Sequence, residues 1–136
     1  MFILGSIQVV KSKGDEVILE SIEKVLKVSR CKKDWKGYNC LLEVSNFELR
    51  FLESSKKNGG QSMSESKGSY FFCLKNVTFY GNRDNYFAFI SKHPTLPLFA
   101  CHVFKADNCS KIKNIMASIG QAFYKFLIDL SQTLLE

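Results

Sequence analysis

The run YFFCLKNVTFYG at residues 70–81, with NYFAFISK at 85–92 and LFACHVFKA at 98–106, carries the strongest structural signal in this chain. All three runs are rich in aromatic and β-branched residues, and the turn-forming segments GNRD and HPTLP separate them. This pattern predicts consecutive strands of an antiparallel sheet. The first run is long enough for two strands, with a break near Lys75 and Asn76.

The N-terminal segment predicts a strand followed by an amphipathic helix. Residues 2–10, FILGSIQVV, form an apolar, β-branched run that ends at KSKG. Asp15 and Glu16 come next, where carboxylates stabilise the positive end of a helix. The apolar residues that follow recur at helical spacing on one face. They are Ile18, Ile22, Val25 and Leu26.

The middle of the chain predicts two more strands and a long loop. YNCLLEV at 38–44 and FELRFLE at 47–53 have strand-like composition, and in the second run apolar and charged residues alternate. Residues 54–69 contain a single Met as their only large apolar residue, so we expect a mobile hairpin loop there. In the run 47–53, the apolar residues that alternate with charged ones are Phe47, Leu49 and Phe51.

The C-terminal third predicts one long amphipathic helix, with Asp107 or Ser110 as its N-cap. Gly120 within it is expected to permit close approach of the helix to the sheet, since a mid-helix glycine otherwise costs about 1 kcal/mol relative to Ala. The apolar stripe consists of Ile112, Ile115, Met116, Ile119, Phe123, Phe126, Leu127, Leu130 and Leu134.

The order of elements predicts the α+β class. A strongly bent antiparallel β-sandwich of about seven strands, with an extra helix after the first strand and a long C-terminal helix over one end, satisfies it. This is the pleckstrin-homology-like arrangement, although composition alone leaves other α+β folds open. At 136 residues the chain is expected to be a single domain, 1–136.

Composition favours a cytoplasmic, non-enzymatic protein. Five cysteines without a CxxC pair indicate reduced thiols, and MFILGSIQVV lacks the features of a signal peptide. His93 and His102 have no neighbours at zinc-ligand spacing, so we expect no metal and a structural role for His102. No phosphate-binding glycine loop or catalytic constellation is recognisable, so neither cofactor nor catalytic residue is expected.

The net charge of +6 favours an acidic partner or an anionic surface, with a solvated face as the simpler interpretation. Nucleic acid is not expected, because the aromatic runs are nearly free of Lys and Arg.

The runs LKN, ISKHP, FACHVF and GQAF, between residues 70 and 127, resemble the second half of phosphotyrosine-binding (PTB) domains. Among these they are most similar to the domains of the JNK-interacting protein scaffolds. The resemblance implies an adaptor that binds peptides with an Asn-Pro-x-Tyr turn from receptor cytoplasmic tails, recruiting it to membrane receptors or vesicles. Kinases and motor proteins would be partners only through the parent scaffold.

PTB domains bind by strand addition, in which the peptide pairs with an exposed sheet edge. Val77 and Phe79 alternate with Thr78 and Tyr80, so we expect one face of this edge strand to enter the core. Ile119, Phe123 and Phe126 of the last helix would form the other wall, with Ile119 mainly in the core. By resemblance, Phe123 packs against the hydrophobic residue upstream of the peptide's Asn. The edge residues are Val77, Thr78, Phe79, Tyr80 and Gly81, and Asn82 and Arg83 receive the peptide's turn.

Phosphate recognition is expected to be weak. Lys92 matches a lysine of phosphate-dependent relatives, but Leu98 and Phe99 stand where those relatives have Arg. Arg30 and Lys32, together with Lys92, are the candidate anion contacts. The sequence therefore predicts little dependence on tyrosine phosphorylation.

Two alternatives use the same fold. One is a homodimerising protein-interaction module that covers its own edge strand. The other is weak contact with acidic lipids such as phosphoinositides. The basic patch for this second alternative would be Lys24, Lys27, Lys32, Lys33 and Lys36.

Overall fold

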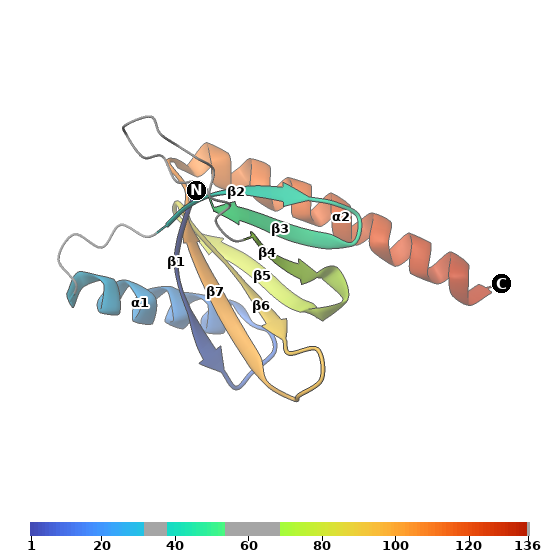
Figure 1. The fold of residues 1–136 in the computed structure, drawn as a ribbon, viewed down its shortest axis with the longest axis horizontal. Helices are drawn as coiled ribbons and strands as arrows, with labels where there is room; N and C mark the ends of the chain where they lie inside the picture. The colour runs from blue at the N-terminus through green and yellow to red at the C-terminus, as the bar shows by residue number, and fades with distance from the viewer. Residues whose placement is uncertain (32–37, 54–68, 136) are drawn as a thin grey trace.

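The computed structural model describes residues 1–31, 38–53 and 69–135 (Figure 1). The expected order of strands and helices is confirmed, including the break in the first aromatic run, where a short 3₁₀ turn separates two strands. The elements are β1 (Phe2–Val9), α1 (Asp15–Cys31), β2 (Tyr38–Val44), β3 (Glu48–Glu53), β4 (Ser69–Cys73), η1 (Leu74–Asn76), β5 (Val77–Arg83), β6 (Tyr86–Lys92), β7 (Phe99–Lys105) and α2 (Cys109–Leu135).

The strands form one seven-stranded antiparallel sheet in the order β4-β3-β2-β1-β7-β6-β5. The sheet bends so that its two halves face each other, and α2 runs across one end (Figure 1). The predicted α+β sandwich is therefore confirmed. Because the sheet does not close into a barrel, β4 and β5 are its two edge strands.

The interior of the sandwich is built from phenylalanines. Phe51 of β3 stacks on Phe104 of β7, with ring centroids 4.5 Å apart, and lies 5.9 Å from Phe89 of β6. Ile112 and Ile119 of α2 complete this core and are almost fully buried. Burying each side chain of this size contributes roughly 1.5–3 kcal/mol, so these contacts bind α2 firmly to the sheet.

The outer face of the β1-β7-β6-β5 half is covered by α1. Ile18 and Ile22 on the predicted apolar face of α1 are buried against Ala88, Ile90 and Val103. Strand β6 is therefore buried on both faces, and its neighbour β5 forms the edge of this half of the sheet.

The N-cap of α2 is Asn108, so the prediction of Asp107 or Ser110 was wrong. The Asn108 Oδ1 atom accepts a hydrogen bond from the backbone N–H of Lys111, 3.0 Å away. The side-chain oxygen of an N-cap residue accepts a hydrogen bond from the backbone N–H three residues later. Asn108 stands three residues before Lys111, which lies in the first turn of α2. Asp107 instead forms an ion pair with the Lys111 side chain at 2.7 Å.

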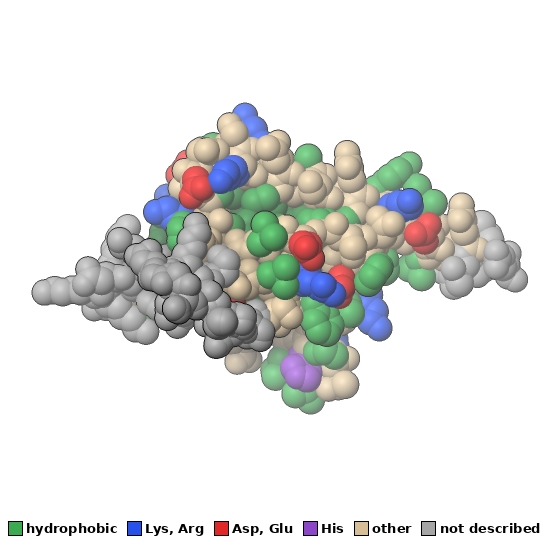
Figure 2. All heavy atoms as spheres, turned by 45° about the horizontal axis from the view of Figure 1, so that its top comes forward, with side chains coloured by type: hydrophobic (Ala, Val, Ile, Leu, Met, Phe, Trp, Pro, Cys, Tyr) green, Lys and Arg blue, Asp and Glu red, His purple; other side chains and the backbone are tan. Residues whose placement is uncertain are grey.

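The second half of α2 projects beyond the sheet (Figure 1). Leu127 is 58% exposed and Leu130 is 45% exposed, and hydrophobic side chains lie along this end of the helix (Figure 2). The apolar stripe thus continues to the end of α2 as predicted, but at these residues it is exposed. A helix of 27 residues is about 40 Å long, whereas a seven-residue strand spans only about 23 Å.

Phe47 also departs from its expected place in an alternating strand. It lies in the turn between β2 and β3 and is 63% exposed, while Leu49 and Phe51 are buried as predicted. The Ser45 hydroxyl accepts the Glu48 N–H at 3.1 Å, which fixes this turn. Of the predicted loop 54–69, only Ser69 is described, and it begins β4.

Candidate functional site

Strand β5 ends in a tight hairpin. Arg83 pairs with Tyr86, so the loop between them consists only of Asp84 and Asn85. Asp84 has a φ of 53°, in the left-handed region that such turns require and that Asp tolerates. Residues that flank a two-residue hairpin loop exchange both backbone hydrogen bonds, so the Arg83 backbone faces β6.

The hairpin register decides which backbone groups of β5 are accessible. Hydrogen-bonding direction alternates along a strand, so Gly81 faces β6 like Arg83, whereas Tyr80 and Asn82 direct their N–H and C=O groups away from it. Strand β5 has no second strand partner among the described residues. These outward groups therefore form an open edge on which another strand can pair.

A β-bulge interrupts β5 at Thr78. Val77 pairs with Ser91 and Phe79 pairs with Ile90, so Thr78 is the extra residue. Its hydroxyl donates to the carbonyl of Ser12, 2.6 Å away, which ties the β1–α1 loop to this end of the edge.

The bulge reverses the expected alternation of side chains. Val77 and Tyr80 pack against the interior core, whereas Phe79 packs on the α1 side. The prediction that Val77 and Phe79 share one face, with Tyr80 on the other, was therefore wrong. One added residue shifts every following side chain to the opposite face.

Tyr80 and Phe123 connect the edge strand to α2. Their rings stack with centroids 5.7 Å apart and planes 1° apart. A Cβ atom on Gly120 would lie 3.3 Å from the Tyr80 hydroxyl, so the glycine leaves room for the tyrosine, which agrees with its predicted role. Phe123 and Phe126 are half-buried, whereas Ile119 is fully buried and belongs to the core, as expected.

The candidate anion contacts do not form one cluster. Lys92 lies at the Val77 end of β5, because Ser91 pairs with Val77, and its Nζ donates to the His93 carbonyl at 3.1 Å. Arg83 lies at the other end, about 20 Å away along the strand, and forms an ion pair with Glu23 of α1 at 3.2 Å. The side chain of Arg30 and all of Lys32 lie outside the described residues.

The basic patch of the lipid alternative is described only in part. Lys24 and Lys27 are exposed on α1, where Glu20 and Glu23 are exposed beside them. Its other members, Lys32, Lys33 and Lys36, lie outside the described residues.

His102 is a structural histidine, as predicted. Its Nδ1 atom lies 2.7 Å from the Ser6 hydroxyl and its Nε2 atom 2.9 Å from the Ser91 hydroxyl. Burial lowers the pKa of His102 to about 4, so the ring is neutral at pH 7. In the described part of the chain, no group of His, Cys, Asp and Glu is arranged to hold a metal ion.

The bent sandwich leaves an open edge strand beside its last helix, an arrangement on which an extended peptide can pair. A family model described as the phosphotyrosine interaction domain (PTB/PID) matches residues 3–133. The chain belongs to this family. No helix in the described ranges is both long and apolar enough to cross a membrane.

Known proteins of similar sequence include kinase-interacting proteins. The chain is 36% identical to JNK-interacting protein 1 of Drosophila melanogaster over 96% of its own length and 26% of that protein's. It is 35% identical to human C-Jun-amino-terminal kinase-interacting protein 1 over 90% of its length and 17% of that protein's. The chain thus spans about a quarter or less of these relatives.

A solved structure has the same fold. The C-terminal phosphotyrosine interaction domain of APBB2 from mouse superposes with a TM-score of 0.58 at 23% identity, covering 89% of this chain and 80% of that one.

Proposed function

We propose that the chain is an adaptor domain that binds Asn-Pro-x-Tyr-type peptides along the edge of β5, largely independently of tyrosine phosphorylation. The observation that carries the proposal is the open edge formed by Tyr80 and Asn82 next to the Tyr80–Phe123 stack. The proposal also rests on membership of the phosphotyrosine interaction domain family.

The backbone supplies affinity. A peptide strand that pairs with β5 forms hydrogen bonds with the outward N–H and C=O groups of Tyr80 and Asn82. The tie between Thr78 and Ser12 limits this pairing to the part of β5 after the bulge. The added strand is therefore short, and side-chain contacts must supply the selectivity.

Phe123 supplies an apolar contact. Its ring and that of Tyr80 are both only half-buried, so together they offer an aromatic surface between β5 and α2. A hydrophobic residue upstream of the peptide's Asn covers this surface, and Phe126 extends it along the helix. Each apolar side chain buried in this way contributes roughly 1.5–3 kcal/mol.

We place the turn of the peptide at the Val77 end of the edge, instead of at Asn82 and Arg83 as the sequence predicted. Lys92 lies at this end, whereas the Arg83 guanidinium at the other end already pairs with Glu23. The nearby Leu98 and Phe99 offer no cation to a phosphate. One lysine gives a phosphotyrosine little advantage over tyrosine, because strong phosphate binding uses several charge-assisted hydrogen bonds.

The similar proteins support a proposal for the cellular setting. Two of them carry kinase-interacting names and are several times longer than this chain. We infer that the domain works in the cytoplasm within a JNK-pathway scaffold and brings receptor tails to it. Kinases and motors would then bind other segments of that scaffold.

Fluorescence polarisation tests this function. A labelled Asn-Pro-x-Tyr peptide is titrated with the domain in its phosphorylated and unphosphorylated forms, and we expect the two dissociation constants to agree within about threefold. Phe123→Arg should abolish binding, since it places a charge on the apolar surface. Tyr124→Arg is the matched control, because Tyr124 is the exposed neighbour on α2. A strong phosphate preference, or equal loss in both variants, contradicts the proposal.

A further inference from the structure

An aromatic cavity lies between the two facing halves of the sandwich. Strand β1 pairs with β2 only at Phe2 and Ile3 and then continues along β7, so the two halves of the sheet diverge beyond this point. The cavity occupies the space between them and has a volume of about 350 Å³. Its lining residues are Ile3 and Ser6 of β1, Phe51 and Glu53 of β3, Tyr70 and Phe72 of β4, and His102 and Phe104 of β7.

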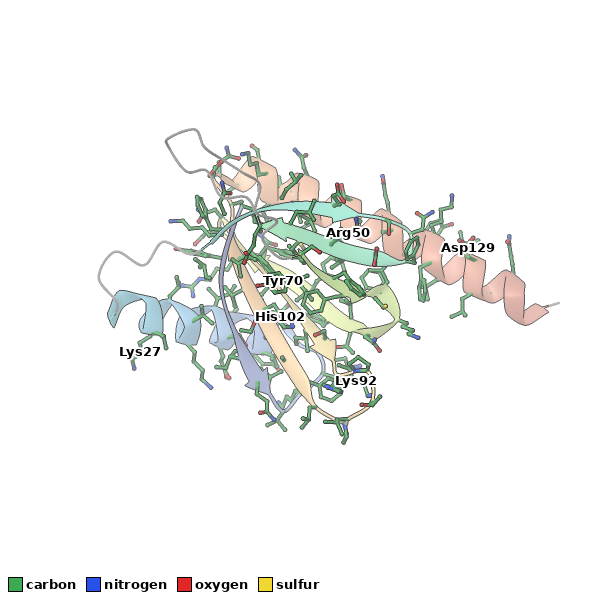
Figure 3. All side chains as sticks on the ribbon, viewed as in Figure 1. Lys27, Arg50, Tyr70, Lys92, His102 and Asp129 are labelled. Carbon is green, nitrogen blue, oxygen red and sulfur yellow. The ribbon has the colours of Figure 1, made fainter. Side chains whose placement is uncertain are left out.

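This cavity is separate from the surface that receives the peptide. None of the described residues of β5 or α2 lines it. A neighbouring cavity, where we place the turn of the peptide, is lined by Lys92 and Leu98 and shares only Phe72 and His102 with this one. The rings of these two residues have centroids 4.7 Å apart, so they stand between the two cavities. Tyr70 and His102 lie together, and Lys92 lies further along the sandwich (Figure 3).

The cavity has an apolar floor and a polar mouth. Phe51 and Phe104 are almost fully buried and stack on each other, so they form the floor. Ser6 is exposed and Tyr70 is 49% exposed, so both lie at the mouth. The Tyr70 hydroxyl donates a hydrogen bond to Oε1 of Glu53, 3.2 Å away. A molecule that enters from solvent therefore places its apolar part on the floor and meets a carboxylate at the mouth.

The charge at the mouth determines the class of ligand. Glu53 is the one charged residue among the described residues that line the cavity, because His102 is neutral at pH 7 and both of its ring nitrogens contact serine hydroxyls. An anionic ligand such as a fatty acid would meet this carboxylate without a lysine or arginine in the lining. A carboxylate accepts about four hydrogen bonds, so Glu53 can accept further bonds from a protonated amine besides that from Tyr70.

We propose that this cavity binds a small organic ammonium ion with an aromatic body, that is, an arylalkylamine. The aromatic body packs against Phe51 and Phe104, and the ammonium group donates to the Glu53 carboxylate. Aromatic rings favour such contacts in offset or edge-to-face geometry. The volume lies near the lower end of the range for ligand cavities, roughly 300–1,000 Å³, which suits one small molecule.

Nuclear magnetic resonance with the ¹⁵N-labelled domain tests the proposal. The probe is tryptamine, which is protonated at pH 7, and tryptophol and indoleacetate present a similar ring with a neutral or a negative group. We expect tryptamine to cause saturable shifts at Ser6, Glu53 and Tyr70, tryptophol to bind about tenfold more weakly, and indoleacetate to bind more weakly still. Saturating Asn-Pro-x-Tyr peptide should leave the dissociation constant of tryptamine unchanged.

Two variants isolate the carboxylate. Glu53→Gln keeps the shape of the side chain and should weaken tryptamine binding about tenfold while leaving tryptophol binding unchanged. Glu43→Gln is the matched control, because Glu43 is exposed on β2, pairs with Arg50 at 3.9 Å and does not line the cavity.

Four results would overturn the proposal. Tryptamine may cause no saturable shifts, or only shifts in β5, in α2 or around Lys92 and Leu98. Indoleacetate may bind as tightly as tryptamine. The Asn-Pro-x-Tyr peptide may displace tryptamine, or Glu53→Gln may bind it as tightly as the natural chain does.

Discussion

Tyr80 of the edge strand and Phe123 of the C-terminal helix stack with their ring planes parallel and their ring centroids 5.7 Å apart. The bulge at Thr78 places Tyr80 on this face, and the absence of a side chain at Gly120 gives its hydroxyl room. The contact therefore links the wall of the proposed groove to the strand on which a peptide pairs.

A double-mutant cycle at Tyr80 and Phe123 should show coupling. Stacked aromatic pairs contribute about 0.5–1.5 kcal/mol beyond the area they bury, so Tyr80→Leu and Phe123→Leu together should destabilise the domain by about 1 kcal/mol less than the sum of the single changes. Urea unfolding measures the three differences in the free energy of unfolding. Strictly additive effects would show that the rings do not interact in solution.

Stability should fall as the pH is lowered, because of His102. Its pKa is about 4 in the folded protein and about 6.5 in the unfolded chain, so between these values the unfolded state binds more protons. The stabilisation is fully present above pH 6.5, and roughly 2 kcal/mol of it should be lost by pH 5.

The comparison of His102→Gln with the natural chain isolates this contribution. Urea unfolding at pH 7, 6 and 5 should show that the variant is less stable at pH 7 and that its stability falls less steeply. Parallel pH profiles for the two proteins would rule out His102 as the cause. Restricting the range to pH 5 and above keeps the carboxylates ionised.

The cysteines should differ in reactivity. Burial raises the pKa of Cys40 to about 11 and also raises that of Cys101, so neither forms much thiolate at neutral pH, whereas Cys109 is exposed. Brief treatment with N-ethylmaleimide at pH 7.5, followed by peptide mass spectrometry, should find label at Cys109 and little at the buried thiols. Labelling of Cys40 at the same rate as Cys109 would mean that the core opens readily.

The sequence predicted the strands well because each has local signals. The run 38–44 became β2 with the same bounds, and the break near Lys75 became η1. These predictions succeed because alternation, aromatic content and turn residues are properties of neighbouring residues.

The errors concern features that depend on the rest of the molecule. The bulge at Thr78 arises where Ser12 contacts the strand, and nothing in the local pattern signals that contact. Leu127 has the helical spacing of a core residue, but it is exposed because α2 extends beyond the sheet. The extent of the sheet cannot be read from the residues around Leu127. The distance between Arg83 and Lys92 follows from the register of the β5–β6 hairpin, which the local sequence does not determine.

Amide exchange along β5 tests the central claim most directly. In the free domain the amides of Tyr80 and Asn82 should exchange rapidly with solvent, while those of Gly81 and Arg83 are protected by β6. An unphosphorylated Asn-Pro-x-Tyr peptide at saturation should slow exchange at Tyr80 and Asn82 and change the other two little. If the peptide binds but leaves Tyr80 and Asn82 exchanging as fast as before, strand addition at this edge is wrong.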